Sequence, residues 1–483
     1  MNNVFERLVE QSISRPQEIA FTDDLETITY RDLACRVYGL ASRLTDAPKT
    51  IGIALSNSID WIVADLAIAL SGRCMVPLPL FFSQMQLTHI IEDSLIGLLL
   101  TNRSTPENII ELKQPFIKID QSMGETPILY AGGAERIIYT SGSTGTPKGV
   151  RLGDRQINHI VDALQDATHA SDQDLHLSTL PFSLLLEQIC GIYLPITAGA
   201  KCHIAGHATQ SALQGDPAPL ASIAAKVKPT TTVLVPQILD MWRQFLNAAG
   251  NNAPDSLRFV AVGGAAITGS SLRLAENTGF PVHQGYGLSE CASVVCLNRI
   301  GKNKLGTVGL PLKGIQLSID NGEIVISSPT VMSGYTNKPL AQEKWHTGDL
   351  GYVNEDGTVV IVGRRDNQIT ISSGRNISPE TVENIIATLP MVKAVALAPN
   401  AANNLAMLVI PEAENFAIFN AMSYENLKTY FQEVLTDLPV YMHPEDVLVC
   451  PLEDAIISGI LKPTGIIDRL KCSGFVQAKA FQL

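Results

Sequence analysis

Cysteine pairs, basic clusters and long apolar runs are all missing from this chain of 483 residues. Its eight cysteines are scattered without a Cys-x-x-Cys pair, which excludes a disulfide framework and predicts reduced, buried thiols in a cytoplasmic protein. Lys and Arg number 35 against 47 Asp and Glu, so the net charge of −12 offers no cationic field for nucleic-acid phosphates. The best apolar runs, such as 62–70, are too short to cross a bilayer, and Glu6 and Glu10 stand where a signal peptide would be basic. We therefore expect a globular protein with no nucleic-acid partner and no membrane span.

The chain has ample material for a core, because 46% of its residues are hydrophobic and its length corresponds to two or three domains of ~150 residues. Short apolar runs alternate with amphipathic stretches, first from Ile51 through 59–70 and 84–92. The same alternation returns at 231–235, which precedes a helix-like stretch at 236–249. Strands that alternate with helices are typical of parallel α/β sheets, so we predict layered α/β structure here.

The pattern of apolar residues changes after Ile315. Short alternating runs are separated by Asn321-Gly322 and by Asp356-Gly357, which are hairpin signals, and they predict a β-rich subdomain. After Asp366 the chain offers helix-like stretches at 379–389 and 424–435 on either side of the run VKAVALAP. That segment is enough for a small, separate α+β domain.

The most informative stretch is IIYTSGSTGTPKGV, residues 137–150. Its glycines let successive backbone N–H groups point at one anion, its hydroxyls add donors, and Lys148 adds charge, so the loop predicts a phosphate cradle. A Walker loop requires Ser or Thr directly after Gly-Lys, whereas Gly149 follows Lys148 here, so a P-loop NTPase is excluded. The predicted phosphate-binding residues are Thr140, Ser141, Gly142, Ser143, Thr144, Gly145 and Lys148.

Four further motifs follow this loop along the chain: GGAAI at 263–267, HQGYGLSE at 283–290, WHTGDLGYVNEDG and GRRDNQI. Together they resemble the adenylate-forming superfamily of acyl- and aryl-CoA synthetases, luciferases and peptide-synthetase adenylation domains. The resemblance extends over nearly the whole chain.

The resemblance implies roles for individual residues. Tyr286 would stack on adenine, Ser289 would bond the α-phosphate, and Glu290 would hold Mg²⁺ through oxygen. Asp349 would accept both ribose hydroxyls, and Arg364 would approach the same sugar. Small residues would let the nucleotide approach closely, namely Gly264, Ala265, Gly285 and Gly287, while Leu184, Gly263 and Leu288 would line the acyl pocket.

Family members run two half-reactions. A carboxylate attacks the α-phosphate of ATP to give acyl-AMP and pyrophosphate, and the thiol of coenzyme A or of a phosphopantetheine-carrying protein then displaces AMP. Between the two, a C-terminal lid domain rotates, so the resemblance divides this chain into residues 1–363, a hinge at 364–366 with Asp366 at its centre, and residues 367–483. The segment around Gly374 would then line the thiol channel.

Two departures from the family pattern stand out. Leu184 replaces the histidine or aromatic residue that often screens the acyl pocket, and LPFSLLLEQ holds no aspartate for an α-amino group, so a fatty or aromatic acid is favoured. Near the C-terminus, Ile466 stands where the family has a lysine that bridges the carboxylate and the α-phosphate, and Lys462 lies four residues earlier. Two interpretations stay open: an ATP- and Mg²⁺-dependent acid–thiol ligase in which Lys462 substitutes, or a degenerate homologue that binds nucleotide or acyl-adenylate or runs one half-reaction.

Overall fold

Two large sheets form most of the molecule. The computed structural model describes residues 1–102, 105, 109, 114–141, 146–265, 267, 269–339, 344–389, 391–436, 438–462 and 467–479. In spatial order, the nine-stranded sheet consists of β15 (Leu310–Pro311), β14 (Cys296–Leu297), β13 (Val282–Tyr286), β12 (Phe259–Val262), β11 (Thr231–Leu234), β9 (Leu175–Ser178), β10 (Lys201–Ile204), β1 (Ile19–Thr22) and β2 (Thr27–Thr29). From β13 to β1 every neighbouring pair is parallel, as the alternation of strands and helices predicts.

The second sheet has eight strands. In spatial order they are β19 (Lys338–Pro339), β18 (Gly334–Tyr335), β8 (Pro147–Gly153), β7 (Glu135–Ser141), β4 (Cys74–Pro77), β3 (Thr50–Ile53), β5 (Leu98–Thr101) and β6 (Phe116–Lys118). The strands from β7 to β6 are parallel, whereas β8, β18 and β19 are added antiparallel. The predicted α/β class is therefore confirmed in both sheets.

A large hydrophobic core joins the two sheets and most of the helices packed on them, while the helix at 84–93 packs in a smaller, separate cluster on the eight-stranded sheet. These helices are α1 (Asn2–Ser14), α2 (Tyr30–Arg43), α3 (Ile59–Leu70), α4 (Gln84–Asp93), α6 (Asp154–Thr168), α7 (Leu185–Gln188), the π-helix η1 (Ile189–Tyr193), α8 (Leu194–Ala198), α9 (Gly206–Leu213), α10 (Ala218–Val227), α11 (Pro236–Ala248) and α12 (Gly269–Asn277). In α3 every residue except Asp60 is buried, because its sequence is apolar around nearly the whole circumference. None of the helices in the ranges given above is long and apolar enough to cross a bilayer.

A buried polar cluster links β7 of the eight-stranded sheet to α3, α7 and η1. Arg136 of β7 lies 3.4 Å from the Asp65 carboxylate of α3 and donates to Gln188 at 3.0 Å. Tyr193 of η1 donates to the second Asp65 oxygen. Each charge is thereby paired, which is the condition under which ions are tolerated in a core.

The β-rich subdomain is a four-stranded antiparallel sheet in the order β16 (Gln316–Asp320), β17 (Glu323–Ser327), β20 (Lys344–Val353) and β21 (Val359–Arg364). Asn321 and Gly322 both have positive φ, +48° and +80°, as a two-residue type I′ hairpin requires. Both hairpins expected from the sequence are present.

The C-terminal unit is built on a three-stranded sheet of β24 (Val392–Pro399), β25 (Leu405–Pro411) and β26 (Asp446–Val449), beside a small hairpin of β22 (Ile369–Thr370) and β23 (Asn376–Ile377). Alternate residues of β25 enter two separate cores, so both faces of this sheet are covered. Its helices are α13 (Pro379–Ile386), α14 (Phe416–Ala421), α15 (Tyr424–Val434), α16 (Leu452–Ile457) and α17 (Arg469–Lys479).

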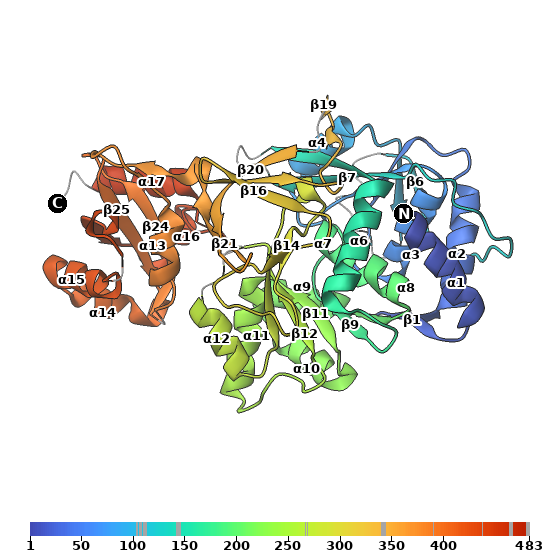
Figure 1. Cartoon of the computed structure of the whole chain (residues 1–483), viewed down its shortest axis with the longest axis horizontal. Helices are drawn as coiled ribbons and strands as arrows, with labels where there is room; N and C mark the ends of the chain where they lie inside the picture. The colour runs from blue at the N-terminus through green and yellow to red at the C-terminus, as the bar shows by residue number, and fades with distance from the viewer. Residues whose placement is uncertain are drawn as a thin grey trace.

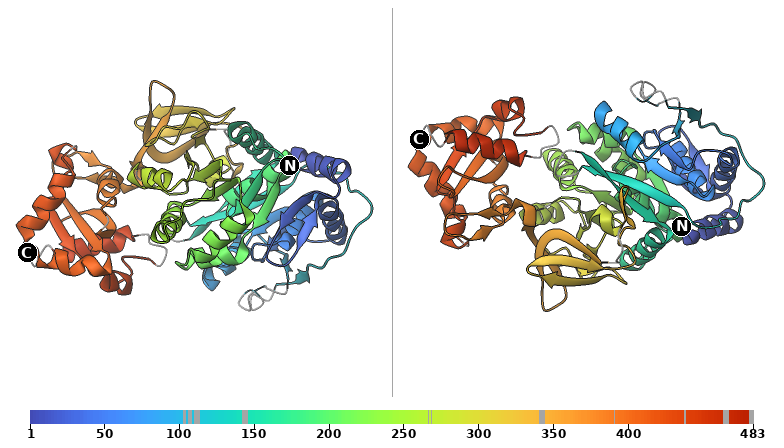
Figure 2. Two further views of the ribbon diagram at one scale, coloured as in Figure 1. Left: turned by 90° about the horizontal axis from the view of Figure 1, so that it is seen from below. Right: turned by 90° about the horizontal axis from the view of Figure 1, so that it is seen from above.

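Figure 1 shows this unit at one end of the molecule, beyond β21, while the N-terminal helices lie at the opposite end. The views from below and above in Figure 2 show the same separation. The chain therefore passes from β21 into the C-terminal unit through one short connection.

Candidate active site

A cavity of about 390 Å³ opens where strands of both large sheets end. Its walls include the ends of β7, β11, β12 and β13, and crevices at the carboxyl ends of parallel strands are the usual ligand sites of such sheets. The cavity brings together nine predicted residues from four separate segments, namely Thr140, Leu184, Gly263, Gly264, Gly285, Tyr286, Gly287, Leu288 and Ser289.

The turn after β13 requires glycine. A Cβ added to Gly287 would lie 1.8 Å from the Ser293 carbonyl oxygen, so no side chain fits there. Ala292 and Ser293 follow with positive φ of +53° and +82°, a conformation that residues other than glycine seldom adopt. Strained backbone of this kind is common at functional sites, and here it folds the chain back beneath Ser289.

Asp349 joins three strands at one edge of the site. This carboxylate is 7% exposed; its Oδ1 accepts from Arg364 at 2.9 Å, and its Oδ2 accepts from the Tyr286 hydroxyl. Asp349 and Arg364 are register partners in β20 and β21, whereas Tyr286 comes from β13 of the nine-stranded sheet. Burial, reinforced by the Asp349 charge, raises the pKa of Tyr286, so the phenol stays protonated and donates.

A second chain of contacts connects Lys148 to Glu290. Strand register sets Lys148 of β8 opposite Thr140 of β7. The Lys148 ammonium lies 5.9 Å from the centre of the Tyr335 ring, and the Tyr335 hydroxyl donates to Glu290 Oε1 at 2.8 Å. Burial and the neighbouring Glu290 charge raise the pKa of Tyr335, so this hydroxyl also remains a donor.

Part of the predicted phosphate cradle lies outside the described residues, namely 142–145 and the side chain of Ser141. The strands on either side of it are held by α4. Asp93 accepts from Tyr139 and Thr336, each at 2.6 Å, and His89 Nε2 lies 3.0 Å from the Pro147 carbonyl oxygen. Both ends of the loop are thus anchored to one helix.

The loop predicted for the adenine side follows β12. Gly264 has a φ of +81°, which favours glycine, and Ala265 is exposed beside it. A Cβ on Gly263 would lie 3.2 Å from the Gly285 carbonyl oxygen, so β12 and β13 meet closely here. The structure thus explains the glycines of this turn by backbone packing, and their role toward a nucleotide stays a prediction.

Leu184 and Leu288 line the cavity as predicted for an acyl pocket, together with Leu185, Leu186 and Val235. Phe81 and Phe82 also line it, with their rings edge to face at 5.2 Å. Sequence reasoning missed these two rings, although their position shortly after β4 was a signal that could have found them. The wall is therefore less purely aliphatic than Leu184 alone suggests.

The C-terminal residues of the prediction lie apart from these walls. Lys462 is about half exposed and its ammonium lies 3.6 Å from Asp468. Ile466 lies outside the described residues. Gly374 has a φ of +77° at the tip of the β22–β23 hairpin, where Ser372 donates its backbone N–H to the Asn403 carbonyl of the same unit at 2.8 Å.

The connection at 364–366 is held on both sides but not in its middle. Arg365 lies 2.8 Å from Glu323 of the β-rich subdomain, whereas Asn367 donates to Glu380 of α13 at 2.5 Å. Burial alone would raise the pKa of Glu323, but the Gly348 N–H, His346 and Arg365 together lower it, so this anchor is ionised at neutral pH. Asp366 is exposed between an anchor on each unit.

No group of three or more His, Cys, Asp or Glu side chains in the described ranges is arranged to hold a metal ion. Glu290 is a single carboxylate next to Ser289, which lines the cavity, and this suits Mg²⁺ because the ion is usually bound by one or two carboxylates together with substrate phosphates. The donor set therefore fits a metal that arrives with a nucleotide.

We expect Tyr335→Phe to lower the affinity for Mg²⁺ in the presence of nucleotide about 10- to 100-fold. This is the usual effect of removing the hydrogen-bonding partner of a metal ligand, and Tyr335 is that partner for Glu290. The measurement is a calorimetric titration of ATP at several Mg²⁺ concentrations. Tyr352→Phe, at an exposed tyrosine of β20, is the matched control. Equal affinity for Mg²⁺ in wild type and Tyr335→Phe would contradict the prediction that Glu290 is the metal ligand.

Known proteins resemble this chain over most of its length. A 2-succinylbenzoate–CoA ligase from Bacillus subtilis is 28% identical over 418 residues, which cover 80% of this chain and 82% of that protein. The crystal structure of the anthranilate CoA ligase AuaEII with anthranoyl-AMP superposes with a TM-score of 0.82 at 18% identity and covers 100% of this chain and 98% of its own. An o-succinylbenzoate coenzyme A synthetase from Bacillus subtilis, in complex with ATP and a magnesium ion, gives 0.76 at 24% identity over 92% of this chain and 95% of its own.

The structural similarities establish the fold, including the small C-terminal unit. The family model described as AMP-binding enzyme matches residues 8–336, more than half of the chain and all the nucleotide motifs up to Tyr335. The protein belongs to the AMP-binding enzyme family.

Proposed function

We propose that the protein is an ATP- and Mg²⁺-dependent acid–thiol ligase, which activates a carboxylic acid as acyl-AMP and transfers the acyl group to a thiol. The observation that carries this is the single cavity in which the phosphate-loop strand, the adenine-side glycines and the Tyr286–Ser289 segment meet an apolar wall. Acid–thiol ligases are also what the named relatives are.

The nucleotide would lie along the edge that Asp349 and Glu290 define. A carboxylate can accept about four hydrogen bonds, and Asp349 accepts two from side chains, so two ribose hydroxyls fit the remaining capacity. Lys148 would face the phosphates from β8, and Glu290 would hold the metal ion, which neutralises phosphate charge when bound. These residues position the groups and balance their charge.

The acid would lie against Leu184, Leu288 and the neighbouring apolar side chains, which favours a fatty or aromatic acid. Coenzyme A is the acceptor in the named relatives and is proposed here, with a phosphopantetheine-carrying protein as the second candidate. All eight cysteines are free thiols, which supports a cytoplasmic location, where thiols stay reduced.

The C-terminal unit, residues 367–483, would rotate as a lid on residues 1–363 between the half-reactions. Arg365 is anchored to Glu323 and Asn367 to Glu380, so backbone rotation about Asp366 can move one unit without breaking either anchor. Rotation there would bring the Gly374 hairpin toward the cavity as the thiol channel.

Asp366→Pro should leave acyl-AMP formation largely intact but slow thioester formation, because proline fixes φ at the one residue that has no anchor. Asp366→Ala keeps φ free and serves as the matched control. The measurement is pyrophosphate exchange beside thioester yield from supplied acyl-adenylate. If both half-reactions fall together in Asp366→Pro but not in Asp366→Ala, the rotation axis lies elsewhere.

The alternative function is a nucleotide or acyl-adenylate binder, or a half-reaction enzyme, and it rests on Ile466 in place of a lysine. Lys462 is the candidate replacement. Its ammonium faces Asp468 in this structure, an exposed pair of the kind that contributes at most about 1 kcal/mol, so it is available to reach elsewhere.

Pyrophosphate exchange with a panel of aromatic and medium-chain acids, followed by mass detection of the CoA thioester, tests the function. If Lys462 replaces the missing lysine, Lys462→Ala should lower the exchange rate ~10²–10³-fold, the usual effect of removing one preorganised donor. Lys393→Ala, at a lysine paired with Glu412 in the same unit, is the control. If Ile466→Lys instead raises the rate and Lys462→Ala changes nothing, adenylation in the natural chain is impaired; if no acid supports exchange in any variant, the binder is the better description.

A further inference from the structure

A second cavity, of about 60 Å³, lies directly behind the first. Five residues line both cavities and form the partition between them: Leu186, Val233, Ala261, Val294 and Leu297. One water molecule needs roughly 10–15 Å³ of cavity volume, so the second cavity has room for several non-hydrogen atoms of a ligand.

The two cavities follow one face of the nine-stranded sheet. Along β12, Phe259 lines the second cavity, Ala261 lines both and Gly263 lines the first. The same order holds along β11 and the residue after it: Thr231 lines the second cavity, Val233 lines both and Val235 lines the first. Alternate residues of a strand share a face, and four residues extend about 13 Å, so the cavities are two parts of one straight path.

The wall opposite the sheet is apolar and comes from α6, η1 and α8, with Leu164, Cys190 and Leu194 among its residues. Of these, η1 is a π-helix, a rare form that is frequent at functional sites. An apolar cavity of this kind stays dry and accepts hydrocarbon. The volume behind the partition is therefore suited to an alkyl chain.

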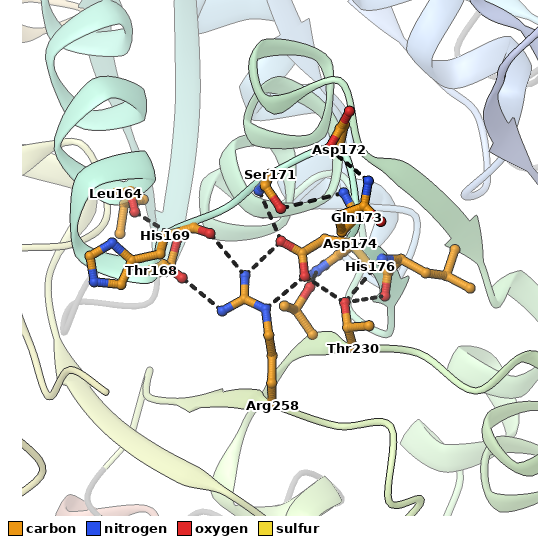
Figure 3. A network of polar contacts seen from close by, with 12 residues as sticks. Leu164, Thr168, His169, Ser171, Asp172, Gln173, Asp174, His176, Thr230 and Arg258 are labelled. Carbon is orange, nitrogen blue, oxygen red and sulfur yellow. Dashed lines mark hydrogen bonds and ion pairs between the residues drawn. The ribbon is translucent and has the colours of Figure 1, made fainter. Parts of the chain in front are cut away.

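A fixed polar network lies at the far end of the second cavity, and Figure 3 shows its contacts. Asp174, which lines the second cavity, accepts from Arg258 Nε at 2.7 Å and Nη2 at 2.6 Å and from Thr230 at 2.7 Å. Arg258 also donates to the Thr168 carbonyl at 2.9 Å. This bidentate arrangement has little freedom to move, so it forms a stop.

His176 also lines the second cavity. Its Nδ1 lies 3.0 Å from Thr231 Oγ1, and its Nε2 faces Glu187 Oε1 at 3.8 Å. Nδ1 therefore has a hydrogen-bond partner, whereas Nε2 and both Glu187 carboxylate oxygens have none among the described residues.

We propose that the two cavities form one channel for an unbranched aliphatic acid of medium chain length, whose carboxylate lies beside Gly263 and Ser289 and whose methyl end approaches the Asp174–Arg258 stop. The proposal rests on the acid–thiol ligase function and selects its substrate class, because an extended alkyl chain makes use of both cavities. Each methylene that enters the second cavity is worth about fourfold in kcat/KM, which corresponds to about 0.8 kcal/mol.

The experiment compares butanoate, hexanoate, octanoate, decanoate, dodecanoate, the ω-hydroxy acids of the same lengths and benzoate, by pyrophosphate exchange and by calorimetric binding. In the wild type, kcat/KM should rise about fourfold per methylene to a maximum and then fall where the stop is reached. Ala170→Leu fills the second cavity and should lower kcat/KM for the best acid at least 10-fold while leaving butanoate and benzoate unchanged. Leu194→Ala widens it and should move the maximum to a longer acid.

Ala47→Leu is the matched control, because Ala47 and Ala170 are both partly buried against the same core and Ala47 lies outside the channel. Equal kcat/KM along the series, a preference for benzoate, or a preference for the ω-hydroxy acid over the alkanoate of equal length would each overturn the proposal. Chain-length-dependent binding that Ala170→Leu abolishes, without pyrophosphate exchange, would uphold the channel and reject the ligase. Exchange with benzoate alone would uphold the ligase and reject the channel.

Discussion

The Asp349 carboxylate is the point on which the arrangement of the site depends. It is buried, so it must be paired, and its two partners come from different parts of the chain: Tyr286 from the nine-stranded sheet and Arg364 from the last strand before the C-terminal unit. One carboxylate therefore fixes the turn after β13 relative to the β-rich subdomain. It also fixes where the proposed hinge would begin, because Arg364 ends β21.

The contacts of Asp349 keep the proposed nucleotide edge rigid and leave the C-terminal unit free to rotate in the proposed mechanism. The proposed nucleotide edge is held by strand register and by hydrogen bonds among residues that precede Asp366, so the proposed rotation of the C-terminal unit would leave it unchanged. Anchors on the two sides of Asp366 confine the proposed movement to one residue. A lid that turns on so short a connection can present two different surfaces to the same cavity.

Local features of the fold were predictable from the sequence, whereas long-range pairings were not. The helix at 59–70, the strand at 231–234 and the Asn321-Gly322 turn follow from periodicity and turn chemistry within a few residues. The role of Tyr335 in holding Glu290 depends on β18 pairing with β8, nearly two hundred residues earlier, and no local pattern encodes that register. The positions of Lys148 and Tyr286 could be inferred from motifs, but their partners required the assembled sheets.

The cavities of the proposed acyl site were also not predictable from the sequence, but for a different reason. Alternation along β11 and β12 identifies which residues share a face, but whether that face is filled depends on helices packed across it. Here Ala261 stands between Phe259 and Gly263, so the same strand lines the deep cavity and ends at the nucleotide edge. A substrate that lies along this face must run parallel to the strand, and its carboxylate then emerges beside the Gly263–Gly264 turn. Strand direction alone thus aligns the reacting end of the acid with the place where the phosphates are expected, and chain length determines how much of the apolar face is used.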